Sequence, residues 1–255
     1  MLKKIYYPAV LLLFFISANA QSDSTTSIWP KISGSADVYY RYNLANPKEG
    51  YNNLTSFTNS HNSFELGMVS LKAEHSIGKV GMVADLGFGR RAEEFSYNDA
   101  NTRLAIKQLY LTYAPSSSLK FTFGSWATHV GYELLDAYLN RNYSMGYMFS
   151  YGPFSHTGIK ADISLGGKSA LMLGVANPTD LKSATGMPKM IIGQFATGSK
   201  DDKLKAYFNF QGGKYNDSAK LFQGDVVLTY AVSDKFNVGY NGTVQSRSAK
   251  TEGKW

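Results

Sequence analysis

The chain offers few side chains that could assemble a catalytic or metal site. It has four histidines and no cysteine in 255 residues, which excludes thiol chemistry and cysteine-ligated zinc. His129 and His156 flank a segment that contains Ser144, Ser150 and Ser155, and a serine beside a histidine is the minimum for a hydrolase nucleophile. No nucleophile elbow surrounds these serines, and no histidine pair has the close helical spacing that zinc sites prefer. We therefore expect no catalytic residues, no metal and no cofactor, with a lipid hydrolase as the least favoured alternative.

Composition limits the fold class before any motif is considered. The chain is 44% hydrophobic, 14% aromatic and 18% charged, and its mean hydropathy is −0.24. This hydropathy is too low for a bundle of membrane helices, and the aromatic content is too high for a disordered chain. The 18 tyrosines and 15 phenylalanines indicate aromatic-lined β structure or an interface.

Residues 1–20 have the pattern of a secretory signal peptide. Two lysines precede an apolar stretch at 5–16, and Ala18-Asn19-Ala20 provides a small-x-small cleavage site. The apolar stretch is shorter than the ~20 residues that span a bilayer, so a membrane anchor is less favoured. A polar lead-in follows at 21–30. The basic residues that remain after cleavage are scattered, so we predict an exported protein without a nucleic-acid partner.

Alternation of apolar and polar residues dominates the rest of the chain. In residues 32–42 the even positions are apolar or small and the odd positions are mostly polar, which is the period of a β-strand with one wet face. One-residue slips of this phase at Met68-Val69 and near Gln108-Leu109 indicate β-bulges. We predict an all-β fold without a helix of ordinary length. Its eleven strands cover residues 32–42, 63–74, 80–90, 106–113, 119–123, 157–165, 170–177, 187–197, 204–210, 222–230 and 236–244.

The connections between these strands alternate between short and long. This rhythm is typical of an outer-membrane barrel, which has short periplasmic turns and longer outer loops. A soluble sandwich shares the strand period but gives no reason for the rhythm. We therefore predict an antiparallel transmembrane β-barrel of the outer-membrane type over residues 31–255. The short turns are 75–79, 114–118, 166–168, 199–202 and 232–235, and the long loops are 43–62, 91–103, 128–155, 178–188, 212–220 and 246–254.

A barrel in hydrocarbon pairs its backbone internally and keeps an apolar outer face towards the lipid, so its polar face points into the lumen. Aromatic rings at strand ends fit the interface girdles of such barrels, although cross-strand pairing in a soluble sheet would explain them too. Basic residues slightly outnumber acidic ones on the predicted lumen face, which suggests a weak anion preference. The lumen-facing charges are Asp37, Arg41, Asp85, Lys107, Lys120, Lys160, Asp162, Lys205 and Asp225, and the girdle rings are Tyr39, Tyr40, Tyr42, Tyr110, Tyr113, Tyr230 and Phe236.

The longest connection, residues 128–155, is rich in apolar and aromatic side chains. Loops of this length without secondary structure are usually functional, and an apolar loop exposed to water would be a liability. We expect it to fold back into the barrel mouth and to bury its rings there. Glu133, Asp136 and Arg141 would then lie at the narrowest point of the pore, where a few charges set selectivity.

Three runs in this region carry a family resemblance: Thr128-His129-Val130-Gly131-Tyr132-Glu133, Asn140-Arg141-Asn142-Tyr143-Ser144 and Pro153-Phe154-Ser155-His156-Thr157-Gly158. On these residues the chain resembles the putative beta-barrel porin family of the OmpL-like type. The resemblance implies an outer-membrane pore for small hydrophilic solutes and no catalytic residues. A basic residue usually follows the Asn-Tyr-Ser run in that family, whereas this chain has Met145, with Arg141 nearby. The motif residues are Thr128, His129, Gly131, Glu133, Asn142, Ser144, Pro153, His156, Thr157 and Gly158.

The number of predicted strands also indicates whether the barrel is complete. Single-chain bacterial barrels have an even number of strands, whereas eleven are predicted here and residues 252–255 show no further alternation. We therefore expect a fragment that lacks its closing C-terminal strands. The predicted function is a porin-like channel in the outer membrane of a Gram-negative bacterium, in contact with lipid and compatible with a homo-oligomer. A non-porous surface or structural barrel is the alternative, because a loop that lines a pore and a loop that closes it look alike.

Overall fold

In the part of the chain that the structure describes, eleven strands paired in chain order form one antiparallel sheet. The computed structural model describes residues 28–49, 56–216 and 218–249, so the predicted signal peptide lies outside the described residues. Within them, no helix has the length and apolar character needed to cross a membrane. The strands are β1 (Lys31–Arg41), β2 (Ser63–Ile77), β3 (Val80–Phe88), β4 (Ile106–Ser116), β5 (Leu119–Ala127), β6 (Ser155–Gly166), β7 (Ser169–Ala176), β8 (Met190–Gly198), β9 (Leu204–Lys214), β10 (Ala219–Ser233) and β11 (Phe236–Ala249).

All eleven predicted strands are present, but several are longer than the apolar alternation indicates. The predicted loop at 212–220 is mostly strand, because β9 continues to Lys214 and β10 begins at Ala219. Gly213 pairs with Leu221, and Lys214 pairs with Lys220. A backbone ladder needs only a partner strand, so it continues here where the apolar period in the sequence has faded.

Two β-bulges lie within one residue of the predicted phase slips. Asp37 pairs with Met68 and Val38 with Leu66, which leaves Gly67 as the extra residue of β2. In β4 the extra residue is Lys107, between the partners of Asp85 and Leu86. A bulge re-aims the side chain of the extra residue, and here it brings Lys107 beside Asp85 on the inner face.

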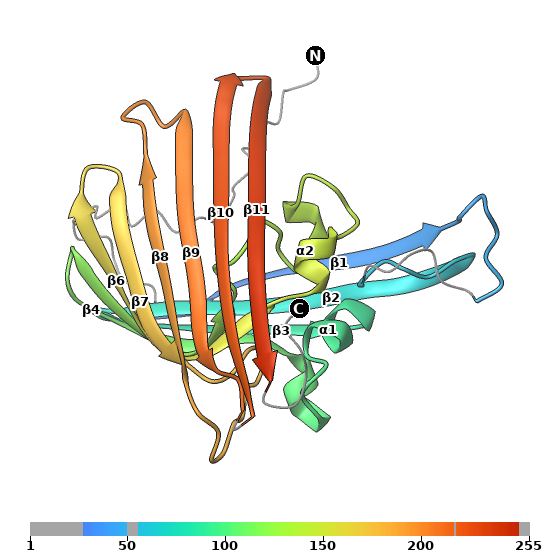
Figure 1. The fold of residues 1–255 in the computed structure, drawn as a ribbon, viewed down its shortest axis with the longest axis horizontal. Helices are drawn as coiled ribbons and strands as arrows, with labels where there is room; N and C mark the ends of the chain where they lie inside the picture. The colour runs from blue at the N-terminus through green and yellow to red at the C-terminus, as the bar shows by residue number, and fades with distance from the viewer. Residues whose placement is uncertain (1–27, 50–55, 217, 250–255) are drawn as a thin grey trace.

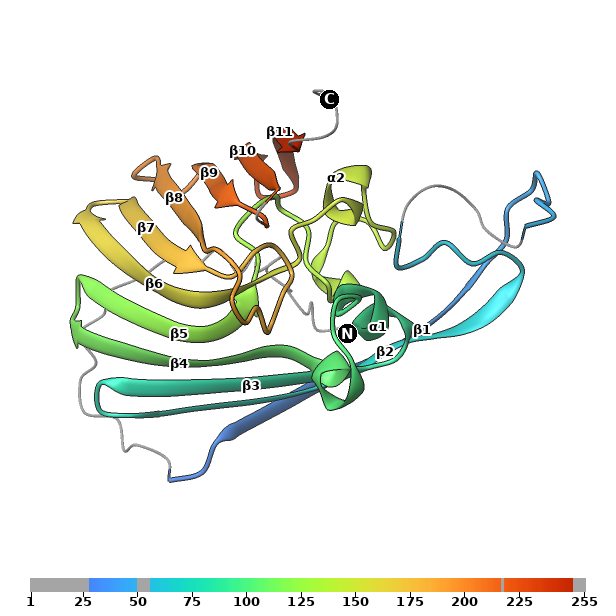
Figure 2. The same ribbon diagram turned by 60° about the horizontal axis from the view of Figure 1, so that its bottom comes forward.

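The sheet curls into a trough whose concave side holds the loops and short helices (Figure 2). The opposite, convex face is apolar and exposed, because every second side chain of a strand points the same way. Large side chains on it show relative exposures from 66% to 88%. They include Val38, Phe64, Leu66, Ile77, Phe123 and Val244.

The predicted aromatic girdle is only partly correct. Tyr39 and Tyr110 lie on the inner face: the Tyr39 hydroxyl contacts Ser60 Oγ at 2.8 Å, and Tyr110 packs on the cluster around Trp126. Their positions in the strand alternation direct them inward. Tyr39 lies near the end of β1, whereas Tyr110 lies in the middle of β4. The other five rings, Tyr40, Tyr42, Tyr113, Tyr230 and Phe236, are exposed.

Loop segments build a second apolar core over the concave face. It is formed mainly by the segment before β2, the β3–β4 connection and the β5–β6 loop, with four short helical turns along the latter two. These turns are α1 (Arg90–Phe95), η1 (Asn101–Ala105), η2 (Ala137–Leu139) and α2 (Tyr147–Ser150). The buried side chains of this loop core are Phe57, Met68, Ala92, Phe95, Leu135, Met145, Phe149 and Phe154.

Within the described residues the sheet is not closed, because β1 pairs only with β2 and β11 only with β10. In Figure 1, β11 lies to the left of α2 and β1 passes below it. The β5–β6 loop that contains α2 therefore lies where both ends of the sheet can reach it.

Candidate functional site

The candidate site is the loop of residues 128–154, which joins β5 to β6 and crosses the concave face. Its side chains and backbone bond to strands far apart in the sheet, from β1 to β10. The loop begins at Thr128, directly after β5, and ends at Phe154, directly before β6.

A pair of imidazoles holds the entry of the loop. Thr128 Oγ1 lies 3.1 Å from His156 Nε2, and His129 Nε2 donates to the carbonyl of Phe210 on β9 at 3.1 Å. The two imidazole rings lie 4.8 Å apart, centroid to centroid. Burial lowers the pKa of His129 to about 4, so this ring is neutral at ordinary pH and serves as a hydrogen-bond donor.

Asp225 on β10 is the next attachment point. It is 3% exposed, and its Oδ1 accepts hydrogen bonds from the Gly131 backbone N–H at 3.0 Å and from Asn209 Nδ2 at 2.6 Å. Its Oδ2 accepts from Asn241 Nδ2 and from Thr243 Oγ1, the latter at 2.7 Å. One buried carboxylate thus joins the loop to three neighbouring strands.

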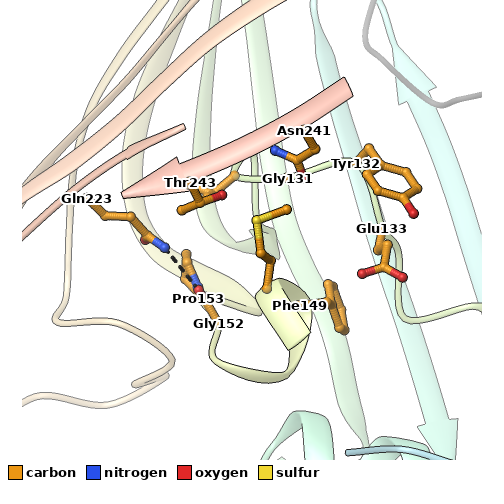
Figure 3. Close-up of a pocket in the computed structure, with 11 residues that line it drawn as sticks. Gly131, Tyr132, Glu133, Phe149, Gly152, Pro153, Gln223, Asn241 and Thr243 are labelled. Atoms are coloured by element: carbon orange, nitrogen blue, oxygen red, sulfur yellow. Dashed lines mark hydrogen bonds between the residues drawn. The ribbon is translucent and has the colours of Figure 1, made fainter. Parts of the chain in front are cut away.

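Glu133 is enclosed within the loop itself. It is 7% exposed, and both its carboxylate oxygens accept from the Gly146 N–H, at 2.9 and 3.1 Å. Burial raises its pKa, against the opposing effect of the bond from Gly146. Glu133 lines a cavity of about 10 Å³ together with Phe149, Gln223 and Asn241 (Figure 3), which is about enough for one water.

Asp136 ties the middle of the loop to the opposite wall. Its carboxylate accepts from Lys107 Nζ at 2.8 Å and from Ser70 Oγ at 3.3 Å. Lys107 also pairs with Asp85 at 3.2 Å, and its side chain is 5% exposed. Two carboxylates, one from β3 and one from the loop, therefore enclose a single buried ammonium group.

Tyr143 attaches the loop to β1. Its hydroxyl donates to Asp37 Oδ1 at 2.6 Å, while Arg91 Nε donates to Asp37 Oδ2 at 2.9 Å. The guanidinium carbon of Arg91 lies 4.8 Å from the centre of the Tyr143 ring. The Arg91 side chain has no exposed surface. The sequence did not identify Arg91 as a site residue, because it lies just beyond β3, where the strand period no longer applies.

Arg141, Asn142 and Ser144 lie at the exposed tip of the loop. A Cβ placed on Gly239 of β11 would lie 3.7 Å from an Arg141 guanidinium nitrogen, so this charge borders the last strand. Asn142 forms a side-chain hydrogen bond with Tyr132. Of the three predicted constriction charges, Arg141 is exposed, Asp136 is partly covered and Glu133 is buried.

The exit of the loop is bonded to strands and to a neighbouring loop. Gln223 Nε2 donates to the Gly152 carbonyl at 3.2 Å (Figure 3). Asp180 of the β7–β8 loop accepts from the N–H groups of Phe154 and Ser155, at 2.6 and 2.9 Å. Burial raises the pKa of Asp180 to about 6. Asp180 was missed from the sequence because nothing in a loop pattern marks a carboxylate that caps another loop.

The remaining motif residues belong to the packing of this exit. Pro153 and His156 are buried, and Thr157 Oγ1 is a buried atom without a hydrogen-bond partner. Gly158 allows the close approach of β7, because a Cβ there would lie 2.1 Å from the Val175 carbonyl oxygen.

The other charges predicted for the lumen also point to the concave side. Arg41 donates to the Thr58 carbonyl at 2.6 Å. Lys120 and Lys160 lie 3.7 and 3.3 Å from the same carboxylate, that of Asp162. Lys205 shares the inner face of β9 with Asn209 by strand alternation.

The expectation that the loop buries its rings is only partly correct. Leu135, Met145 and Phe149 are buried in the loop core. In contrast, Tyr138 and Tyr151 are 68% and 77% exposed. The phenol hydroxyl groups are polar and the loop core is already filled by Phe side chains, so these tyrosines remain outside it.

The histidines and serines considered for hydrolysis have other partners. His156 contacts Thr128, and His129 bonds to the Phe210 carbonyl. Ser150 Oγ donates to the Gly146 carbonyl at 3.1 Å. Among the described residues, no group of three or more histidine or acidic side chains is placed to hold a metal ion.

Comparisons with known proteins identify the family of the chain. A search of curated proteins found no match. The structure is similar to the crystal structure of the outer membrane channel DcaP of Acinetobacter baumannii, with a TM-score of 0.42 and 12% sequence identity, over 91% of this chain and 78% of that one. The profile of the family described as putative beta-barrel porin-2, OmpL-like, matches residues 30–254. The chain therefore belongs to this OmpL-like family of β-barrel porins.

Proposed function

We propose that the protein is a porin-like channel through which small hydrophilic solutes diffuse across the outer membrane, with the 128–154 loop as its constriction. Family membership supports the channel. The observation that carries the constriction is the attachment of the loop at both sides of the trough, by Tyr143 to Asp37 on β1 and by Gly131 to Asp225 on β10. A loop held at both sides leaves a restricted passage beside it.

Within this proposal the three loop charges have different roles. Arg141 is exposed beside β11, so it contributes directly to the field in the passage. Asp136 forms an ion pair with Lys107, and Glu133 stabilises the loop by accepting a hydrogen bond from the Gly146 N–H. In a narrow channel a few exposed charges act at short range on the permeating ion, which makes Arg141 the main candidate for a selectivity residue.

The charges of the concave face that do not bond to the loop favour anions. On β5, β6 and β9 the concave face carries Lys120, Lys160 and Lys205, against Asp162. Together with Arg141 they give the passage a basic excess, which raises the local concentration of small anions. The convex face, with side chains such as Phe123, is proposed to contact lipid.

Conductance of the purified protein in planar bilayers tests the channel. We expect discrete conductance steps and, in a salt gradient, a reversal potential that indicates weak anion preference. Arg141→Ala should reduce that preference and leave the protein folded, whereas Lys168→Ala, a charge in the β6–β7 turn, should leave the reversal potential unchanged. Correctly folded protein without conductance would contradict the proposal.

A non-porous surface barrel remains the second candidate, because the loop core fills part of the mouth with packed rings. Phe57, Phe149 and Phe154 lie within 5.4 Å of one another, centroid to centroid. If these rings closed the passage completely, liposomes containing the folded protein would not swell in any sugar solution.

A further inference from the structure

Asp225 is bonded to three structural elements besides its own strand. It receives four hydrogen bonds: one from the loop, one from β9 and two from β11. Its own strand, β10, lies between those two strands in the sheet. The side chain therefore sits at the junction of the loop with the last three strands.

None of the four donors is a cation, since they are a backbone N–H, two amides and a hydroxyl. A buried carboxylate is tolerated only when its oxygens are fully hydrogen-bonded. Bonds to a charged acceptor are stronger than neutral ones. The Asp225 carboxylate thus holds the Gly131 N–H in place, and the carboxylate itself needs this hydrogen bond to be tolerated in the interior.

The loop is shaped to make this contact. Gly131 has a φ of +78°, in the left-handed region that side chains rarely adopt. Its neighbour Val130 donates its N–H to Thr128 Oγ1 at 3.1 Å, which sets the preceding turn. The Gly131 N–H is consequently directed to Asp225.

A second bond joins the exit of the loop to the same face of β10. Gln223 lies two residues from Asp225 and donates to the Gly152 carbonyl (Figure 3). The entry and exit of the loop are therefore fastened side by side to one strand. In contrast, the middle of the loop is held on the other side of the trough by Asp136 and Tyr143.

We infer that Asp225 is a positioning residue that holds the 128–154 loop against β10 and thereby sets the size limit of the passage. The inference rests on the proposed channel function. Without the carboxylate the loop keeps its anchors at Lys107 and Asp37 and the Gln223 bond at its exit, but its entry loses the bond to β10. The entry of the loop then moves away from that wall and the passage widens.

Liposome swelling with a graded series of neutral sugars tests this inference. In Asp225→Ala we expect the rate for a trisaccharide, relative to a monosaccharide, to rise several-fold. Asp225→Asn keeps one acceptor oxygen but loses the charge and the second acceptor, so its ratio should lie between those of the wild type and Asp225→Ala. Asp234→Ala removes the same charge from the exposed turn between β10 and β11 and should not change the ratio.

Hydrogen exchange of the loop gives a readout that does not depend on transport. The segment 129–134 should exchange many-fold faster in Asp225→Ala than in the wild type, because the Gly131 N–H loses its acceptor. Should Asp225→Ala fail to fold, Gly131→Ala, which strains the same contact from the loop side, takes its place. Unchanged exchange and an unchanged sugar ratio in a folded variant would overturn the inference, whereas an impermeable wild type with faster exchange in the variant would contradict only the channel.

Discussion

Lys107 shows how a single side chain can join a strand to the loop. It is the bulged residue of β4, and its ammonium group lies 3.2 Å from Asp85 and 2.8 Å from Asp136. All three groups are largely buried. Buried ion pairs are weak evidence for stability while intact, but breaking one leaves an uncompensated charge.

We therefore expect Lys107→Met to lower the free energy of unfolding by about 3–5 kcal/mol, because two carboxylates would face each other without a cation. Urea unfolding of the protein folded into lipid vesicles measures this change. Lys168→Met is the matched control: Lys168 pairs with Asp202 at an exposed turn, where such a pair contributes less than about 1 kcal/mol. Equal effects of the two substitutions would refute the buried cluster.

Asp180 gives the fold a pH dependence in the mildly acidic range. Burial raises its pKa from 3.8 to about 6 in the folded protein, so the folded state binds this proton more tightly than the unfolded chain does. The contribution of Asp180 to stability is therefore greatest below pH 3.8, falls as the pH rises to about 6 and is level above that.

We expect this decline to approach about 3 kcal/mol for the single group, and Asp180→Asn to remove it. The comparison requires unfolding midpoints of both proteins between pH 4 and 7, with the amide still able to accept from Phe154 and Ser155. A variant whose decline matched the wild type would show that other groups cause it.

Residue positions within strands were predictable, whereas partners across loops were not. Asp37, Asp85 and Asp225 lie on the inner face because alternation fixes the side of a strand on which a side chain lies. Arg91 and Asp180 became visible only in the structure. Their partners are up to 83 residues away in sequence, and no local period encodes such a contact.

At the scale of elements, alternation predicted all eleven strands, and the phase slips predicted the bulges at Gly67 and Lys107. It underestimated strand length where polar or small residues continue the ladder, as in β9 and β10. The short turns α1 and α2 were not predicted, because helices of six and four residues are too short to show a helical period.

Close packing of β6 against β7 depends on Gly158. A Cβ at this position would lie 2.1 Å from the Val175 carbonyl oxygen and 2.7 Å from Ala176 Cα, both backbone atoms that cannot turn away. We expect Gly158→Ala to destabilise the fold by about 1–3 kcal/mol, as overpacking does.

The control for Gly158 is Gly224→Ala on β10, where the nearest atom to an added Cβ is a Phe222 ring carbon at 3.9 Å. Thermal unfolding in detergent would compare the two variants. Equal stability of the two variants would mean that β6 and β7 are packed less closely than the structure shows.

At the scale of the whole molecule, the two faces of the sheet have opposite solvent requirements. Val244 and Gln245 are neighbours on β11 and point to opposite faces. Val244 is 73% exposed on the apolar convex side, and Gln245 lies across from Gln223 on the concave side. Lysine substituted at each of these two adjacent positions in turn therefore tests which face of the sheet contacts lipid.

Val244→Lys should hinder folding into lipid vesicles by about 2–4 kcal/mol, because a charge on the lipid face near mid-membrane is costly. Gln245→Lys should fold nearly as well as the wild type, because its side chain faces the wet interior. The measurement is the free energy of unfolding in vesicles, and equal penalties would argue against a lipid-facing convex surface.

The attachments of the loop have a consequence for assembly. Gly131 and Asp225 are 94 residues apart, and Tyr143 and Asp37 are 106 apart, whereas each hairpin joins adjacent strands. Contacts between distant segments form late, because long stretches of chain must first be brought together. Hairpins can accordingly form one after another, but docking of the loop on β10 must wait until that strand has joined the sheet. The trough is therefore widest during biogenesis and narrows only in a final step.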